Sequence, residues 1–141
     1  AALSAGFPRR EARAHAAAAL AEMGIARWSE SLAGELPYGL ERRVEVSRAL
    51  AMKPKFLLLD EPAAGLNEDE STELMEILRP IPKQKLLGML IVDHDMRLIM
   101  GLCDRLHVLS YGKTIGEGSP EEVRQIPAVV QAYLGNSRTR K

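Results

Sequence analysis

Two adjacent carboxylates, Asp60 and Glu61, directly follow a run of large apolar residues that begins at Phe56 and ends at Leu59. A short continuous apolar run is typical of a strand that is buried on both faces of a parallel sheet. Such a strand delivers its last side chains to the carboxyl edge of the sheet, where α/β proteins bind ligands. One acid there can hold Mg²⁺ while the other orients or deprotonates a water. We therefore interpret Asp60 as a metal ligand and Glu61 as a catalytic residue of nucleotide hydrolysis; the alternative is that the pair only caps the next turn.

A histidine follows a second apolar run in the same way. Residues 86–92 are apolar and are followed by Asp93, His94 and Asp95. His94 could donate a hydrogen bond to the charge that develops on a γ-phosphate, or it could only satisfy nearby backbone groups. One metal ion cannot easily use all three side chains, because adjacent residues on a strand point to opposite faces. We therefore interpret His94 as a second catalytic candidate.

Helices and strands alternate along the chain and would position these side chains. The alanine-rich residues 8–23 favour a helix that Gly24 ends, and a second helix opens near Pro37 and continues to about residue 52. Beyond it we expect a strand at 56–60, a helix at 67–78 that Pro80 and Pro82 break, a strand at 86–92, a helix at 96–102, a hairpin of strands at 105–110 and 113–117, and short helices from 120 to 134. This alternation predicts an α/β fold with a parallel sheet.

Four segments carry a resemblance to a known family. They are LPYGLERRVEVSRALA at 36–51, FLLLDEP at 56–62, AAGLN at 63–67 and IVDHD at 91–95. Their order and spacing resemble the second half of an ABC-type ATPase. There they are similar to the signature motif with its helix, the Walker B strand with its glutamate, the D-loop, and the strand that ends in the switch histidine. The run from His94 to Gly135 further resembles the ATP-binding subunits of branched-chain amino acid importers.

The resemblance implies where a nucleotide would bind. In the family, the signature helix presents backbone N–H groups to a phosphate held on the opposite subunit, as helix N-termini do for anions, and the D-loop crosses the subunit boundary. The implied nucleotide-binding residues are Leu36, Pro37, Tyr38, Gly39 and Leu40 in the signature segment and Gly65, Leu66 and Asn67 in the D-loop segment. The signature segment departs from the family's Ser-Gly-Gly-Gln, and only Gly39 keeps the permissive backbone that close phosphate approach needs.

The same two segments also have plain structural interpretations. The helix that opens near Pro37 could be an ordinary amphipathic helix, with Arg42, Arg43 and Arg48 on its exposed face. The D-loop segment could be a glycine turn that leads into a helix capped by Asn67. The glycine turn is compatible with the functional interpretation of its segment, whereas the ordinary amphipathic helix is an alternative to it.

The implied fold is P-loop NTPase-like: α/β, with a mostly parallel sheet flanked by helices and part of a helical subdomain at the N-terminus. We expect residues 1–52 to form the helical subdomain portion and residues 53–141 the C-terminal part of the ATPase core. No G-x-x-x-x-G-K-[ST] phosphate loop occurs in the sequence. We therefore expect the N-terminal half of the domain to be absent and the chain alone to be inactive. The family places the phosphate-loop strand between the strands ending at Asp93 and beginning at Arg105, which predicts a gap or an unpaired apolar edge and self-association.

Composition limits the possible partners and compartment. The 141 residues include 19 basic and 19 acidic side chains, so charge gives no argument for nucleic acid. A single cysteine, Cys103, cannot form an internal disulfide, which favours a reducing compartment. No apolar run reaches the roughly 20 residues that span a bilayer. We therefore expect a cytoplasmic protein.

The resemblance adds cofactors, partners and a function. It implies ATP and Mg²⁺, a second ABC ATPase subunit, membrane permease subunits, an indirect link to a periplasmic substrate-binding protein, and a peripheral place on the inner face of the cell membrane. The implied function is to couple ATP binding and hydrolysis to the import of branched-chain amino acids. Two alternatives stay open: an ATPase of another ABC branch, such as lipopolysaccharide export, and a non-catalytic interaction module.

Overall fold

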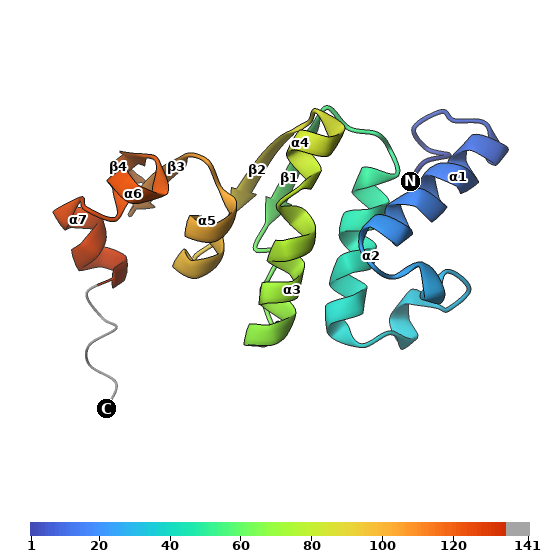
Figure 1. Ribbon diagram of the computed structural model, residues 1–141, viewed down its shortest axis with the longest axis horizontal. Coiled ribbons are helices and arrows are strands. Elements are labelled where there is room, and N and C mark those ends of the chain that lie inside the picture. Colours follow the sequence, from blue (N-terminus) through green and yellow to red (C-terminus); the bar gives the residue numbers. More distant parts are fainter. Residues whose placement is uncertain (135–141) are drawn as a thin grey trace. The chain divides into compact units, whose positions relative to one another are not determined.

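The computed structural model describes residues 1–134, which form two compact units, Ala1–Val92 and the described part of Asp93–Lys141 (Figure 1). Each unit combines helices with a pair of strands, so the α/β class expected from the sequence is confirmed. The boundary between the units follows the second strand, and the expected division after residue 52 stays a prediction. Over the described residues, no helix combines the length and the apolar character needed to cross a membrane.

The first unit contains most of the elements expected from the sequence. In chain order they are α1 (Arg9–Glu22), η1 (Ala26–Trp28), η2 (Ala33–Glu35), α2 (Tyr38–Leu50), β1 (Phe56–Asp60), α3 (Glu68–Leu78), α4 (Ile81–Lys85) and β2 (Gly88–Val92). Helix α3 ends before Pro80, as expected, but a short helix begins directly after it. Pro82 lies in the first turn of α4, where its missing N–H costs nothing.

Helices α1 and α2 pack against each other, as Figure 1 shows for the blue and teal ribbons. Ala19 of α1 and Val46 and Leu50 of α2 are buried. Ser47 joins the two helices, because its hydroxyl donates to the carbonyl of Ala19 at 3.3 Å and to its own helix at Arg43. Gly24 ends α1 with φ +70, a conformation that glycine adopts at little cost.

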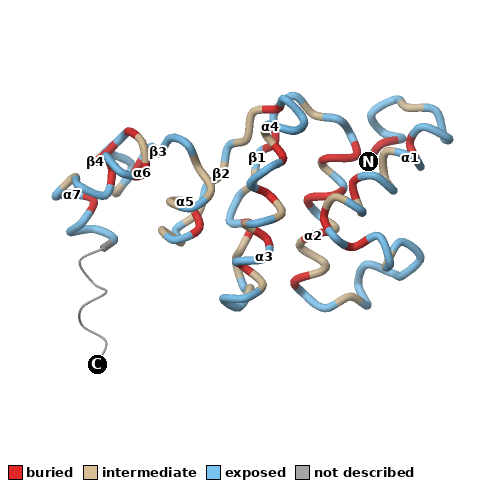
Figure 2. Tube along the Cα trace, in the orientation of Figure 1, coloured by how far each residue is buried: buried red, intermediate tan, exposed pale blue. Residues whose placement is uncertain are grey.

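Strands β1 and β2 pair in parallel, with Phe56 opposite Gly88 and Asp60 opposite Val92. The expectation that both strands are buried on both faces is wrong. Leu57 is only 2% exposed, but its neighbours Phe56 and Leu58 are 72% and 70% exposed. In Figure 2, β2 is tan and pale blue along its length, in line with its burial pattern.

The reason is that this two-stranded sheet is covered on one side only. Successive strand residues point to opposite faces, so Phe56, Leu58 and their neighbours Leu90 and Val92 form one uncovered apolar face. Leu90 and Val92 are 59% and 58% exposed. The continuous apolar run expected of a buried strand is present in the sequence, but none of the described residues covers this face.

Strand β2 also begins later than the sequence suggests. We expected a strand from residue 86, but Leu86 has φ +51, is 92% exposed and closes α4. Leu87 is buried, and the amide of Gly88 donates to the carbonyl of Lys55 at 2.9 Å. Pairing with β1 therefore fixes the start of β2, and apolar character alone does not.

The second unit is built on the expected hairpin. Its elements are α5 (Met96–Leu102), β3 (Leu106–Ser110), β4 (Lys113–Gly118), α6 (Pro120–Val123), α7 (Pro127–Val129) and the π-helical turn η3 (Val130–Leu134). Strands β3 and β4 are antiparallel, with an irregularity between Val108 and Leu109. Leu106 and Val108 pack with Val123 and Val129 in a small core of their own.

The mostly parallel sheet expected from the sequence needs correction for this chain. The described strands form two separate pairs, one parallel and one antiparallel, and β2 does not pair with β3. Between β2 and β3 the chain forms only α5. The gap expected between Asp93 and Arg105 stays a prediction.

Candidate active site

The paired carboxylates stand at the carboxyl end of β1. Both Asp60 and Glu61 are exposed, so their oxygens are accessible. The amide of Glu61 donates to the carbonyl of Val92 at 2.7 Å, which continues the pairing with β2 one residue past the strand. Glu61 has φ +44, uncommon for a residue other than glycine. Strained backbone of this kind concentrates at functional sites, which supports Glu61 as a candidate.

The loop after Glu61 is a succession of tight turns. The amide of Ala64 donates to the carbonyl of Glu61 at 3.0 Å, and the amide of Leu66 donates to that of Ala63 at 3.1 Å. Gly65 takes φ +79. The loop ends at Asn67, which caps α3 as expected.

Asn67 and Glu70 form a reciprocal cap. The amide of Glu70 donates to Oδ1 of Asn67 at 2.9 Å, and the amide of Asn67 donates to Oε2 of Glu70 at 3.0 Å. This arrangement satisfies two backbone donors that a helix start leaves unpaired. The end of the D-loop segment is therefore firmly held.

The first turn of α2 lies against this cap. Pro37 precedes the helix, and its carbonyl accepts from the amides of Leu40 and Glu41 at 2.9 and 3.0 Å. Gly39 is buried, and a Cβ atom there would stand 2.8 Å from Oε1 of Glu70. Glycine is thus needed for close packing of two helix starts. Leu36, in the turn before Pro37, is half-buried.

Tyr38 makes a second link between the two segments. Its hydroxyl donates to the carbonyl of Ala64 at 3.0 Å, and its ring occupies the space that a side chain at Gly65 would need. Arg42 donates to the same hydroxyl from Nε at 3.0 Å and from Nη2 at 2.6 Å. Hydrogen bonding to Glu45, and less strongly to Tyr38, raises the pKa of Arg42. The sequence offered one signal for this cluster, the spacing of four residues between Tyr38 and Arg42.

Arg43 corrects the expectation that three arginines share an exposed face of α2. It is only 7% exposed and forms an ion pair with Glu73 of α3, whereas Arg48 is exposed. The hydrogen bond from Arg43 lowers the pKa of Glu73. Arg43 turns inward because the carboxylate of a distant helix compensates its charge.

His94 belongs to the second unit and follows Val92 by two residues in the chain. Its side chain is 75% exposed, and Nδ1 lies 3.8 Å from Oδ1 of Asp93. The side chain of Asp93 is almost fully buried and accepts from the amide of Asp95 at 2.9 Å. Asp95 in turn caps α5. Asp93 and Asp95 thus serve the local backbone.

The end of β1 is better suited to Mg²⁺ than to a metal ion that needs several side-chain ligands. Mg²⁺ is usually bound through one or two carboxylates, waters and substrate phosphates, and Asp60 offers one such carboxylate. Within residues 1–134, no group of three or more His, Cys, Asp or Glu side chains could hold a metal ion.

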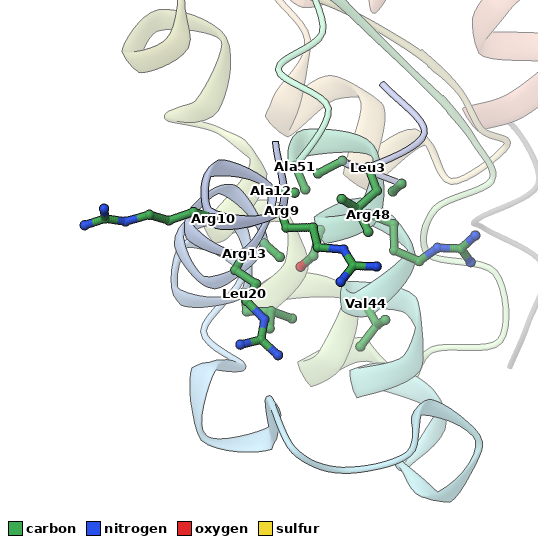
Figure 3. Close-up of a pocket in the computed structure, with 13 residues that line it drawn as sticks. Leu3, Arg9, Arg10, Ala12, Arg13, Leu20, Val44, Arg48 and Ala51 are labelled. Carbon is green, nitrogen blue, oxygen red and sulfur yellow. The ribbon is translucent and has the colours of Figure 1, made fainter. Parts of the chain in front are cut away.

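A groove of about 910 Å³ lies elsewhere in the first unit, between α1 and α2 (Figure 3). Alanines and arginines of α1, including Arg9, Arg10 and Arg13, line it together with Val44 and Arg48 of α2. None of the residues interpreted as catalytic or nucleotide-binding lines this groove.

Comparisons with known proteins point to the same family as the motifs. The family model for ABC transporters matches residues 3–64, and the model for branched-chain amino acid ATP-binding cassette transporters matches residues 113–138. The high-affinity branched-chain amino acid transport ATP-binding protein LivG of Salmonella typhimurium is 40% identical over 127 residues, which make up 90% of this chain and 50% of LivG. The lipopolysaccharide export system ATP-binding protein LptB of Acidithiobacillus ferridurans is 39% identical over 117 residues, 83% of this chain and 48% of LptB.

A solved structure resembles the fold as well. The structure of cbiO1 from Clostridium perfringens, part of the ABC transporter complex cbiONQ, matches with a TM-score of 0.78 and 32% identity over 89% of this chain and 50% of that one. The chain therefore spans about half the length of the curated relatives it matches. Together these findings show that the chain belongs to the ATP-binding proteins of ABC transporters, and that it is similar to those of branched-chain amino acid transport.

Proposed function

We propose that this chain is the hydrolytic part of an ABC-type ATPase that couples ATP binding and hydrolysis to the import of branched-chain amino acids through membrane permeases. One observation carries the proposal: Asp60 and Glu61 stand exposed at the end of β1, where Glu61 has φ +44 and its amide donates to the carbonyl of Val92. The 40% identity to LivG over 90% of the chain supports the choice of branch.

The proposed chemistry assigns one role to each catalytic candidate. Glu61 orients a water and accepts its proton while the water oxygen bonds to the γ-phosphorus of ATP. The bond from that phosphorus to the bridging oxygen breaks, and ADP and phosphate leave. Asp60 would hold Mg²⁺, which when bound neutralises phosphate charge. His94 donates a hydrogen bond to a γ-phosphate oxygen.

The remaining site residues face the nucleotide from two segments. Backbone groups of residues 36–40 approach a phosphate on a second ABC ATPase subunit, because the N–H groups of a helix start favour anions. Gly65, Leu66 and Asn67 lie beside them and cross to the same subunit. The contacts of Gly39 with Glu70, and of Tyr38 with Ala64, support the idea that these two segments act as one surface.

The proposal also covers how the chain works with others. ATP is the substrate, permease subunits and a second ATPase subunit are the partners, a periplasmic binding protein is an indirect partner, and nucleic acid is not involved. The protein acts at the inner face of the cell membrane. Residues 1–52 serve as the helical subdomain portion and residues 53–141 as part of the ATPase core.

The chain alone is proposed to be inactive, because no residue of its sequence supplies a phosphate loop. The test joins the first half of LivG before residue 1, which we name the joined protein. Its Glu61→Gln variant should bind ATP with Mg²⁺ and accumulate as a dimer, measured by nucleotide retention and light scattering. The chain alone should do neither. Turnover by the chain alone above its own Glu61→Gln variant would refute this inactivity.

The same experiment separates the alternatives. A folded joined protein that retains no ATP would exclude the ATPase and favour an interaction module. The match to LptB supports the second candidate, lipopolysaccharide export. Stimulation of ATP hydrolysis by branched-chain amino acid permease subunits, and not by lipopolysaccharide-export permeases, would favour the import function.

A further inference from the structure

Tyr38 holds the loop between Glu61 and Asn67 by two kinds of contact. Its hydroxyl donates to the carbonyl of Ala64 at 3.0 Å. Its ring also packs on Gly65, where a Cβ atom would stand 2.8 Å from ring carbon Cε1. The loop therefore cannot move away without breaking a hydrogen bond and opening a gap.

Arg42 fixes the direction in which Tyr38 donates. A phenol hydroxyl has one proton to donate and can also accept hydrogen bonds. Arg42 donates to it at 3.0 and 2.6 Å, and its guanidinium lies 5.0 Å from the ring centroid. The phenol proton is then left for Ala64. Glu45 holds Arg42 in place with an ion pair at 2.8 Å.

The held loop is connected directly to the candidate catalytic residue. The amide of Ala64 donates to the carbonyl of Glu61 at 3.0 Å. Ala64 is therefore fixed by two hydrogen bonds, one from its amide to Glu61 and one from Tyr38 to its carbonyl. Glu61 itself is in a strained left-handed conformation that its neighbours must maintain. Contacts thus run from the first turn of α2 through Ala64 to the backbone of Glu61.

We propose that Tyr38 is a positioning residue: its side chain fixes the loop 62–67, and through it the backbone of Glu61, relative to the first turn of α2. The inference rests on the proposed function, in which Glu61 activates water. In that function, the signature segment would present backbone N–H groups to a phosphate and would also position Glu61 through Tyr38. The helix start that faces the nucleotide of the second subunit and the residue that activates water in this subunit are then linked by one side chain.

The chain supplies a matched control for this role. Tyr133 makes the same kind of bond in the second unit, where its hydroxyl donates to the carbonyl of Leu109 at 2.7 Å. Tyr133→Phe and Tyr38→Phe each remove one tyrosine-to-carbonyl hydrogen bond and keep the ring. A general loss of stability would affect both variants alike, whereas a positioning role is specific to Tyr38.

The first measurement uses the chain itself. Amide hydrogen exchange followed by mass spectrometry should show exchange in residues 62–67 about fivefold faster in Tyr38→Phe, the loss expected for one neutral hydrogen bond. Tyr133→Phe should leave this segment unchanged. Equal exchange in the Tyr38→Phe and wild-type chains would overturn the inference, whatever the chain's function.

The second measurement uses the joined protein and steady-state ATP hydrolysis. Tyr38→Phe should lower kcat about fivefold and leave KM for ATP within about twofold, because orientation at Glu61 changes and nucleotide contacts do not. Arg42→Met should have a similar effect, and the double variant should be no worse than either single one, since both residues act through the same bond. If the losses of kcat in the two single variants add up in the double variant, Arg42 and Tyr38 do not act through the same hydrogen bond.

The two possible failures give different results. If the wild-type joined protein hydrolyses ATP and Tyr38→Phe has the same kcat, the inference is wrong and the proposed function stands. If the wild-type joined protein folds but does not hydrolyse ATP, the proposed function fails, and hydrogen exchange in residues 62–67 alone decides whether Tyr38 holds the loop.

Discussion

The two strand pairs of this molecule are stabilised in different ways. The antiparallel pair β3–β4 is joined by a tight turn and packs Leu106 and Val108 against nearby Val123 and Val129. The parallel pair β1–β2 is joined by a long crossover through α3 and α4, and buries one face while Phe56 and Leu58 stay exposed on the other. The hairpin is locally complete, but the parallel pair is not.

The candidate site lies on the less complete of the two strand pairs. Parallel sheets are normally covered on both faces, so the bare apolar face of β1–β2 sets this pair apart from the hairpin. Asp60 and Glu61 stand at the end of this incomplete pair. The hairpin pair, in contrast, has a surface network of Arg105 and Glu117 at 2.8 Å that needs nothing beyond its own unit.

The sharpest test of the comparison uses two neighbours on β1. Leu57→Ala should lower the free energy of unfolding of the first unit by about 3 kcal/mol, because it empties a buried site. Leu58→Ala should cost less than about 1 kcal/mol, because most of that side chain is already in water. Amide hydrogen exchange of the first unit measures both. Equal losses of unfolding free energy in the two variants would mean that the face of β1–β2 with Leu58 is covered.

The ion pair between α2 and α3 gives the next largest effect. Glu73→Ala should cost about 2 kcal/mol, because it leaves the buried guanidinium of Arg43 without a partner. Arg43→Met should cost about 1 kcal/mol or less, since Glu73 is largely exposed and can return to water. Thermal unfolding of the two variants checks the order. The reverse order would show that Arg43 is not truly buried.

The two helix caps offer a smaller and symmetric comparison. Asn67→Ala in the first unit and Ser119→Ala in the second each remove the acceptor of a reciprocal cap and should cost about 1 kcal/mol. Each loss should be confined to its own unit, which segment-resolved hydrogen exchange can show. A loss spread over both units would contradict the division after Val92.

The smallest effect is a dependence on pH. Arg43 lowers the pKa of Glu73 below its ordinary value of 4.5 in the folded state. This carboxylate therefore stabilises the fold fully above its ordinary pKa, and the contribution is lost as the pH falls through the lowered folded value. Exposure of Glu73 keeps the effect modest. The stability difference between wild type and Glu73→Gln should shrink from pH 7 to pH 3, and a constant difference would contradict the linkage.

Local signals in the sequence predicted the elements well. The apolar run 56–59 with Asp60 predicted β1 to the residue, and Asn67 correctly marked the start of α3, because strand propensity and helix capping act over a few neighbours. The hairpin at Gly112 was equally clear. These features need no information about distant parts of the chain.

Contacts between distant residues could not be predicted in this way. The bond from Tyr38 to Ala64 spans 26 residues, and the inward turn of Arg43 depends on Glu73 of another helix. The bare face with Phe56 and Leu58 also escaped prediction, since a buried and a bare strand face can have the same sequence. The sequence therefore predicted which residues are candidates for the site, but not the contacts that hold them in place.

The central claim is that the carboxylate that activates water stands at the end of β1 and not on the hairpin β3–β4. The most direct test compares ATP hydrolysis by the joined protein carrying Glu61→Gln with the same protein carrying Glu117→Gln, an exposed carboxylate on β4. Glu61→Gln should lower kcat by at least about a hundredfold, as loss of a general base does, while Glu117→Gln should leave kcat within about twofold. Hydrolysis that is unchanged by Glu61→Gln, or lost equally in both variants, would contradict the account.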